Sequence, residues 1–195
     1  HHLEDKLKTT EIKGTTGIGH TRWATHGVPN EANAHPHVSG DVVIVHNGII
    51  ENFKPLKDEL QKDGYVFTSQ TDTEVVAHLI ARERARGAAP KEAVANVLGR
   101  LEGAFALAVL FSGEHDLMIG ARMGAPLAVG HGDGQMYLGS DAIALAPFTN
   151  RVTYLEDGDW VVLTRTSFDI HDAKGAKIKR PMNFTQASAF MADKG

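Results

Sequence analysis

The 195-residue chain contains no cysteine. It cannot form a disulfide, and we therefore expect a cytoplasmic location rather than a secreted one. It also has no apolar stretch of membrane-spanning length, and its first residues do not form a signal-peptide pattern. These absences argue against a disulfide-stabilised secreted domain and against a membrane protein.

Strong charge of either sign is missing as well. The formal net charge is −4 at pH 7, and Lys and Arg do not gather into a run. Proteins that bind nucleic acids or acidic membrane surfaces usually carry such a run, so we expect neither partner. Hydrophobic residues make up 42% of the chain and charged residues 23%, a balance typical of one globular domain.

The spacing of apolar residues predicts a layered α+β domain. Asn52 is expected to cap a helix, and Thr71 and Glu74 have the spacing of a capping box at the start of another. The predicted helices cover residues 52–63, 71–87, 90–101 and 142–146. The predicted strands cover residues 17–25, 41–46, 65–68, 104–111, 117–122, 127–130, 136–139, 152–155, 159–164 and 168–171.

The domain organisation follows from the two polar ends of the chain. Residues 1–13 are charged and are expected to be an expression-tag remnant with an irregular surface lead-in. Residues 14–180 form the predicted domain. The tail is polar from Gly175 on, and residues 181–195 are expected to be a linker.

Four polar, glycine-containing segments lie between apolar runs, at residues 19–27, 33–37, 46–52 and 70–74. Such segments usually line a site rather than a core. They supply the guanidinium of Arg22, the carboxylate of Asp72, the Asn47-Gly48 pair and several imidazoles. This set could hold a small zwitterion and stabilise a developing oxyanion.

Each of these residues also has a simpler explanation. Arg22 could be a solvated charge, and Asp72 could serve only the dipole of the helix that it begins. Asn47-Gly48 is a favoured pair for a two-residue hairpin turn, although no second strand of matching length follows it. The histidines at 35 and 37, and at 20 and 26, suggest a metal site, but no carboxylate or cysteine stands at a recognised ligand spacing.

Taken together, the four segments resemble the class II glutamine amidotransferases, and most closely the glutaminase domain of the glucosamine-6-phosphate synthases. The motifs are His-Thr-Arg-Trp-Ala-Thr-His-Gly from His20, Asn-Ala-His-Pro-His from Asn33, Val-His-Asn-Gly-Ile-Ile-Glu-Asn from Val45, and Thr-Asp-Thr-Glu-Val from Thr71. The family order and spacing are kept, and the likeness covers residues 14–180.

The resemblance implies an N-terminal-nucleophile hydrolase fold, a four-layer αββα sandwich with two antiparallel sheets. It implies glutamine as substrate, no metal and no cofactor, and as partners an isomerase domain of the same full-length protein and further copies of that protein. It also implies the site. Arg22 would bind the α-carboxylate of glutamine and Asp72 its α-ammonium group. Trp23, Thr25 and His26 would line the pocket, and Asn47 and Gly48 would form the oxyanion hole.

The sequence departs from the family in one essential respect. The family's nucleophile is an N-terminal cysteine whose own α-amine acts as the base, and this chain has none. The opening strand and helix of the family are also absent, so we expect the chain as given to be inactive in glutamine hydrolysis. The alternatives are a catalytically silent glutamine-binding or interaction module and a histidine-rich metal-binding protein.

Overall fold

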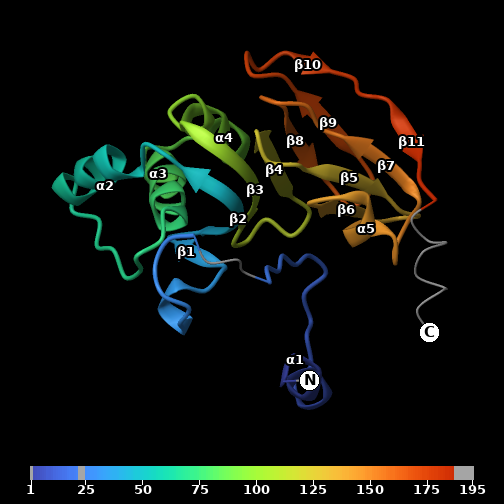
Figure 1. Ribbon diagram of the computed structural model, residues 1–195, viewed down its shortest axis with the longest axis horizontal. Coiled ribbons are helices and arrows are strands. Elements are labelled where there is room, and N and C mark those ends of the chain that lie inside the picture. Colours follow the sequence, from blue (N-terminus) through green and yellow to red (C-terminus); the bar gives the residue numbers. More distant parts are fainter. Residues whose placement is uncertain (1, 22–24, 187–195) are drawn as a thin grey trace.

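Two antiparallel sheets form the centre of the computed structural model, which describes residues 2–21 and 25–186. The larger sheet has the strand order β1-β2-β3-β4-β8-β9-β10, and the smaller has the order β11-β7-β5-β6 (Figure 1). The larger sheet contains β1 His37–Ser39, β2 Val42–Ile50, β3 Gly103–Phe111, β4 Met118–Met123, β8 Trp160–Leu163, β9 Phe168–His171 and β10 Lys177–Ile178. The smaller contains β5 Ala128–His131, β6 Met136–Gly139, β7 Arg151–Tyr154 and β11 Met182–Phe184.

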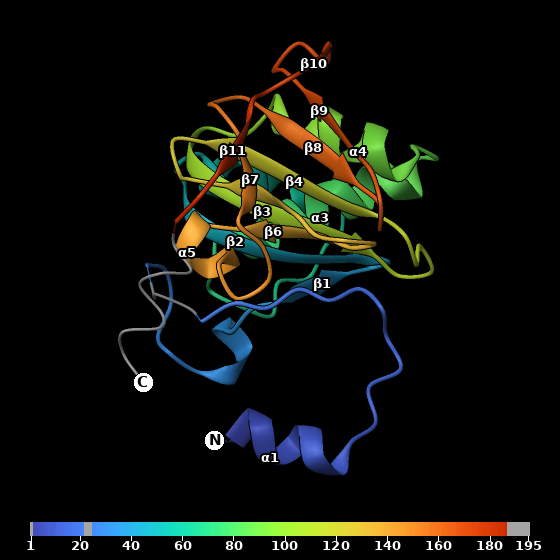
Figure 2. The same cartoon turned by 90° about the vertical axis from the view of Figure 1, so that its right-hand side faces the viewer.

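Most of the helices cover the outer faces of the sheets. The described helices are α1 His2–Thr9, the 3-10 turn Glu31–Asn33, α2 Phe53–Lys62, α3 Thr73–Ala85, α4 Pro90–Leu98 and α5 Ala142–Leu145. Helices α2, α3 and α4 lie on one side of the larger sheet, while α1 lies away from the body of the fold in both views (Figures 1 and 2). None of the described helices is long and apolar enough to cross a membrane.

Alternation along the strands separates the core into layers. On β3, Phe105 and Leu107 belong to the cluster packed against the helices, whereas Ala106 belongs to the cluster between the two sheets. On the outer face of the smaller sheet, Leu145 of α5 packs in a third cluster with two further buried residues. The order of layers is therefore helices, larger sheet, smaller sheet and α5, in agreement with the predicted α+β sandwich. The short α5 is the outer helical layer on that side within the described residues.

Strand β2 is longer than the sequence predicts. The expected strand ended at residue 46, but β2 continues to Ile50 and pairs with β3 along its whole length, with Asn47 opposite Ala106. Gly48 has φ +108°, and a Cβ at this position would lie 2.0 Å from the carbonyl oxygen of Ala104. The Asn47-Gly48 pair is therefore part of a central strand and not a hairpin turn.

The predicted capping box at the start of α3 is wrong. The helix begins at Thr73, and Asp72 occupies the N-cap position without a side-chain capping bond. The carboxylate of Glu74 instead accepts hydrogen bonds from the backbone N–H groups of Thr68 and Ser69, at 2.8 and 2.7 Å. Burial alone would raise the pKa of Glu74, but these bonds and those from the two hydroxyls outweigh it and lower the pKa. Residues 65–68, for which a strand was predicted, form a loop that ends at these bonds.

Asn52 likewise precedes its helix without capping it. Its side-chain amide donates to the carbonyl of Arg100 at 2.8 Å and accepts from the N–H of Glu102 at 3.1 Å. These bonds connect the start of α2 to the turn before β3. The sequence predicted the helix correctly, but not the long-range contact that its first residue makes.

Most of the other predicted helices and strands are confirmed, and the errors lie near the two ends of the chain. The four predicted helices and the strands from residue 104 on are confirmed, with ends that differ by at most three residues. The described part of the predicted strand at 17–25 is irregular. The lead-in contains helix α1 where an irregular segment was expected, and the tail contains β10 and β11. Strand β11 pairs with β7, with Met182 opposite Thr153.

Candidate functional site

A polar cavity of about 240 Å³ lies beside the second half of β2 and the start of α3. It is lined by His20, Thr25, His26, His35, His46, Asn47, Gly48, Thr71, Asp72 and Thr73. The cavity thus brings together five residues that the sequence predicts for the site, namely Thr25, His26, Asn47, Gly48 and Asp72. The other two, Arg22 and Trp23, lie outside the described residues.

Asp72 is the buried carboxylate of this cavity. Its side chain is 4% exposed, and its Oδ2 accepts a hydrogen bond from the backbone N–H of Ile50 at 2.8 Å. Its Oδ1 lies 3.9 Å from Nδ1 of His26. The carboxylate therefore connects the first residues of α3 to the last residue of β2. A solvated charge that only favours the helix dipole would not have this burial or this partner.

Asn47 and Gly48 contribute to the lining from β2. Their backbone is fixed by the ladder to β3, where Gly48 is opposite Phe105. The side-chain Oδ1 of Asn47 lies 2.6 Å from Nε2 of His20, which belongs to the irregular segment at residues 17–21. A polar amide is thus presented to the cavity from a rigid strand, which is the arrangement that electrostatic stabilisation of an oxyanion requires.

Threonines at the start of α3 are bonded to three further imidazoles. Thr73 Oγ1 is hydrogen-bonded to Nδ1 of His46 at 2.9 Å and to Nε2 of His35 at 3.1 Å. Thr71 Oγ1 is hydrogen-bonded to Nε2 of His37 at 2.9 Å. Because a threonine hydroxyl has a single proton, Thr73 can donate to one imidazole only and must accept from the other.

His46 is neutral at physiological pH. Burial lowers its pKa to about 4; the carboxylate of Asp72 opposes this shift, and the imidazoles of His20, His26 and His37 add to it. The cavity therefore combines one buried carboxylate with an uncharged imidazole. A cationic group of a ligand would find a favourable place near Asp72.

Sequence reasoning missed five residues of the lining: His20, His35, His46, Thr71 and Thr73. His20 and His35 were considered only as a metal motif, and the two threonines only as part of a capping pattern. All five belong to the same four polar segments as the predicted site residues, so the segments themselves were the signal. Within the described residues, no group of three or more His, Asp or Glu side chains could hold a metal ion.

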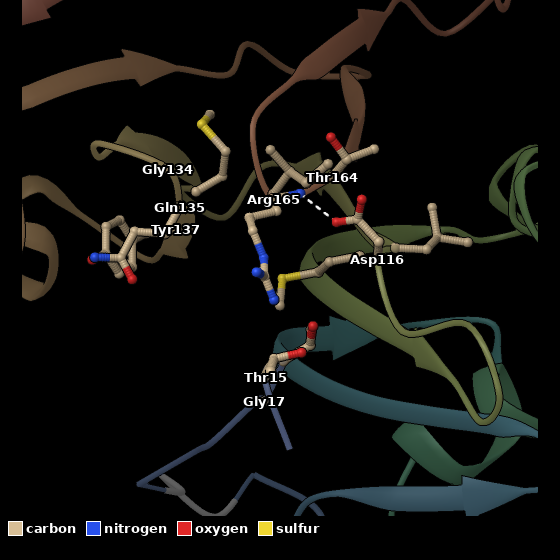
Figure 3. A pocket seen from close by; sticks show the side chains of 13 residues that line it. Thr15, Gly17, Asp116, Gly134, Gln135, Tyr137, Thr164 and Arg165 are labelled. Carbon is tan, nitrogen blue, oxygen red and sulfur yellow. Dashed lines mark hydrogen bonds between the residues drawn. The ribbon is translucent and has the colours of Figure 1, made fainter. Parts of the chain in front are cut away.

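A larger cavity lies away from these residues. It measures about 450 Å³ and is formed by residues 15–17, the start of β4, the β5–β6 turn and the β8–β9 turn (Figure 3). The side chain of Arg165 extends into it, and the backbone N–H of Arg165 donates to Oδ1 of Asp116. None of the predicted site residues lines this cavity. Its larger size alone does not make it a better candidate for the functional site than the polar cavity.

A third cavity, of about 430 Å³, connects the polar cavity with the space between the sheets. It shares His20, His46 and Asn47 with the polar cavity. Most of its other lining residues are apolar or glycine, and they come from the segment at residues 17–21, from β3 and β6, and from α5 and the residues beside it. The amide of Asn47 therefore stands at the border between a polar and an apolar compartment.

The family of the chain follows from a match to a family model, which covers the described residues of the polar cavity. Residues 20–147 match the family model described as "Glutamine amidotransferase domain". The chain belongs to this family. Every described residue that lines the polar cavity falls within the matched range.

Curated relatives extend the match to the whole chain. It is 66% identical over 194 residues to the "Glutamine--fructose-6-phosphate aminotransferase [isomerizing]" of Mesorhizobium japonicum, covering 100% of this chain and 32% of that protein. It is 57% identical over 189 residues to the protein of the same name from Zymomonas mobilis, covering 97% of this chain and 31% of that protein. The chain thus spans about a third of the length of the relatives that it matches.

A solved structure confirms the fold class. The glutamine phosphoribosylpyrophosphate amidotransferase from B. subtilis, complexed with ADP and GMP, superposes with a TM-score of 0.65 at 28% identity. The superposition covers 78% of this chain and 34% of that one. The amidotransferase domain described here has the predicted N-terminal-nucleophile hydrolase sandwich of two antiparallel sheets.

Proposed function

We propose that this chain is the glutamine-hydrolysing domain of a glutamine–fructose-6-phosphate aminotransferase. It releases ammonia from the side-chain amide of glutamine, and an isomerase domain of the same full-length protein uses the ammonia to convert fructose 6-phosphate to glucosamine 6-phosphate. The names and the greater length of the relatives support this proposal. The full-length protein is expected to be cytoplasmic and homo-oligomeric.

The observation that carries the proposal is the position of Asp72 and Asn47 at one cavity. A carboxylate as buried as that of Asp72 is costly without a cation beside it, and the α-ammonium group of glutamine supplies that cation. Arg22 presents a two-pronged donor to the α-carboxylate. Thr25 and His26 line the cavity, and they would contact the glutamine together with Trp23, as the family resemblance implies.

The chemistry begins when a cysteine thiolate adds to the amide carbon of glutamine. Negative charge then develops on the amide oxygen, and the side-chain N–H of Asn47 and the backbone N–H of Gly48 stabilise it. The C–N bond breaks as the nitrogen is protonated, ammonia leaves, and water hydrolyses the thioester to glutamate. The thiol comes from an N-terminal cysteine outside the 195 residues, and its own α-amine removes the proton.

The test compares the full-length protein with the 195-residue chain. Ammonia release from glutamine is measured for both, with each preparation freed of contaminating glutaminase. We expect release by the full-length protein and none by the chain alone, because the chain has no thiol. Ammonia release by the purified chain would contradict the thiol mechanism.

A second candidate is a catalytically silent glutamine-binding module, in which the cavity beside Asp72 and Asn47 holds glutamine without hydrolysing it. The same experiment separates the two functions when glutamine binding is measured by calorimetry on the full-length protein. Binding without ammonia release, in a preparation whose intact mass proves the N-terminus complete, would establish the silent module. Binding with release establishes the glutaminase.

A further inference from the structure

The side chain of Asn47 has a partner that the proposed reaction does not explain. His20 is 27 positions earlier in the chain, yet its Nε2 lies 2.6 Å from Oδ1 of Asn47. Within the described part of the chain, the side-chain amide of Asn47 is hydrogen-bonded to His20. The contact decides which end of the amide is available to a ligand, because Oδ1 is already engaged.

The two ends of an asparagine side chain have opposite electrostatic effects. The NH₂ group donates and would stabilise an oxyanion, whereas the oxygen only accepts and would repel it. Rotation by a half turn about the last side-chain bond exchanges the two ends with little change of shape. We propose that His20 is a positioning residue, which donates from Nε2 to Oδ1 of Asn47 and so keeps the Asn47 NH₂ group free for the oxyanion. This inference rests on the function proposed above.

His20 is itself held in place by the start of α3. Its ring lies against the ring of His35, with centroids 4.2 Å apart, and His35 is hydrogen-bonded through Nε2 to Thr73. Thr73 is the first residue of α3 and directly follows Asp72. The chain of contacts therefore runs from the residue proposed to bind the ammonium group to the residue proposed to stabilise the oxyanion. Binding and catalysis share one rigid support.

Donation from His20 to Asn47 requires one particular tautomer of the His20 imidazole. A neutral imidazole carries one proton, and donation to Oδ1 places that proton on Nε2. With the proton on Nδ1 instead, Nε2 would accept, and the amide would turn its oxygen towards the oxyanion. A donating partner also polarises the amide and strengthens the N–H groups at its other end.

The experiment is a double-mutant cycle in the full-length protein, with kcat and KM measured for ammonia release. His20→Ala is expected to lower kcat by about ten- to a hundredfold, the range for a misplaced catalytic group. KM for glutamine should change less than about twofold, because the ground state carries no oxyanion. Since His20 acts through Asn47, His20→Ala should add little to the loss already caused by Asn47→Ala.

Two matched substitutions test the direction of the hydrogen bond. His20→Gln keeps a donor of similar reach and should recover most of the lost kcat. His20→Glu offers only acceptor oxygens, so it should reverse the amide and lower kcat at least as far as His20→Ala. His115→Ala removes an exposed imidazole outside the site and serves as the control for loss of a histidine. Thermal melting of each variant gives the folded fraction by which kcat is corrected.

The outcomes separate this inference from the proposed function. If Asn47→Ala lowers kcat but His20→Ala does not, or if the two losses multiply in the double variant, the positioning role is wrong while the oxyanion role stands. Equal rates for the Gln and Glu variants would also overturn it. If the full-length protein releases no ammonia at all, the proposed function fails, and the inference fails with it.

Discussion

Asp72 accepts a hydrogen bond from the backbone N–H of Ile50 across 2.8 Å, from the first turn of α3 to the last residue of β2. One carboxylate oxygen therefore has a structural partner, and the other lies on the side of His26. This division lets the contact of Asp72 with the fold and its proposed binding of a cation be tested separately.

Replacing Asp72 with Asn should weaken glutamine binding without unfolding the protein. The substitution keeps an oxygen that can accept from Ile50 but removes the negative charge. Loss of a hydrogen bond to a charged group costs about 1.5–3 kcal/mol, so KM in the full-length protein should rise roughly ten- to more than a hundredfold. Steady-state kinetics of ammonia release measures this.

Asp72→Ala is the matched comparison. It also leaves the buried N–H of Ile50 without an acceptor, which should lower the free energy of unfolding by about 1–3 kcal/mol relative to wild type. Urea unfolding of the two variants checks the difference. If Asp72→Asn leaves KM unchanged, Asp72 does not bind the ammonium group.

Gly48→Ala should disrupt the β2–β3 ladder. The new Cβ would meet the carbonyl oxygen of Ala104 at 2.0 Å, and the backbone has φ +108°. Overpacking costs about 1–3 kcal/mol, and a left-handed backbone about 1–2 kcal/mol more for a residue with a side chain. Denaturant unfolding should reveal the sum of both penalties.

Gly64 provides the control for this substitution. It has φ +89°, but nothing lies within 4 Å of a Cβ built there. Gly64→Ala should therefore show the backbone cost alone, about 1–2 kcal/mol. Equal losses for the two variants would mean that the close approach of Ala104 has no energetic effect.

The protein should lose stability in mild acid partly through His46. Burial lowers the pKa of its imidazole from the ordinary 6.5 to about 4. An unfolded histidine gains a proton in this window that the folded one does not, so the stabilising contribution is complete above pH 6.5 and is lost as the pH falls towards 4. At about 1.4 kcal/mol per pKa unit, this shift contributes on the order of 3 kcal/mol to the free energy of unfolding.

His46→Gln removes the titrating group and keeps a polar partner for Thr73. Urea unfolding at several pH values between 7.5 and 4.5 should show a shallower loss for this variant than for wild type. Burial also lowers the pKa values of His78, His131 and His171, so part of the acid sensitivity should remain. An identical loss in wild type and variant would contradict the role of His46.

Local patterns predicted the elements better than their contacts. Strand 136–139 and the helix that begins at Pro90 were predicted correctly at those positions, because Gly-containing turns around a short apolar segment and a proline in the first turn are local signals. Glu74 has the spacing of a capping box, but its side chain bonds to Thr68 and Ser69 across a loop. Local spacing contains no information on that loop.

The polar segments predicted which residues form the site, but not how they meet. Asn47-Gly48 has the sequence of a hairpin turn, and pairing with β3 overrides this preference because β3 supplies a partner for every residue of β2. The bond between His20 and Asn47 joins an irregular segment to strand β2, and their approach depends on the packing of the whole domain. One sequence gives the residue types at a site, whereas their distances depend on tertiary packing.

The most direct test of the account is Asn47→Ala in the full-length protein, measured for kcat, KM and thermal stability on the same preparation. Removing one oxyanion donor typically costs about 2.7–4 kcal/mol, so kcat should fall by about 10²–10³. KM should move little, because the interaction is made only in the transition state. A variant that folds stably and turns over glutamine at the wild-type rate would contradict the oxyanion role of Asn47.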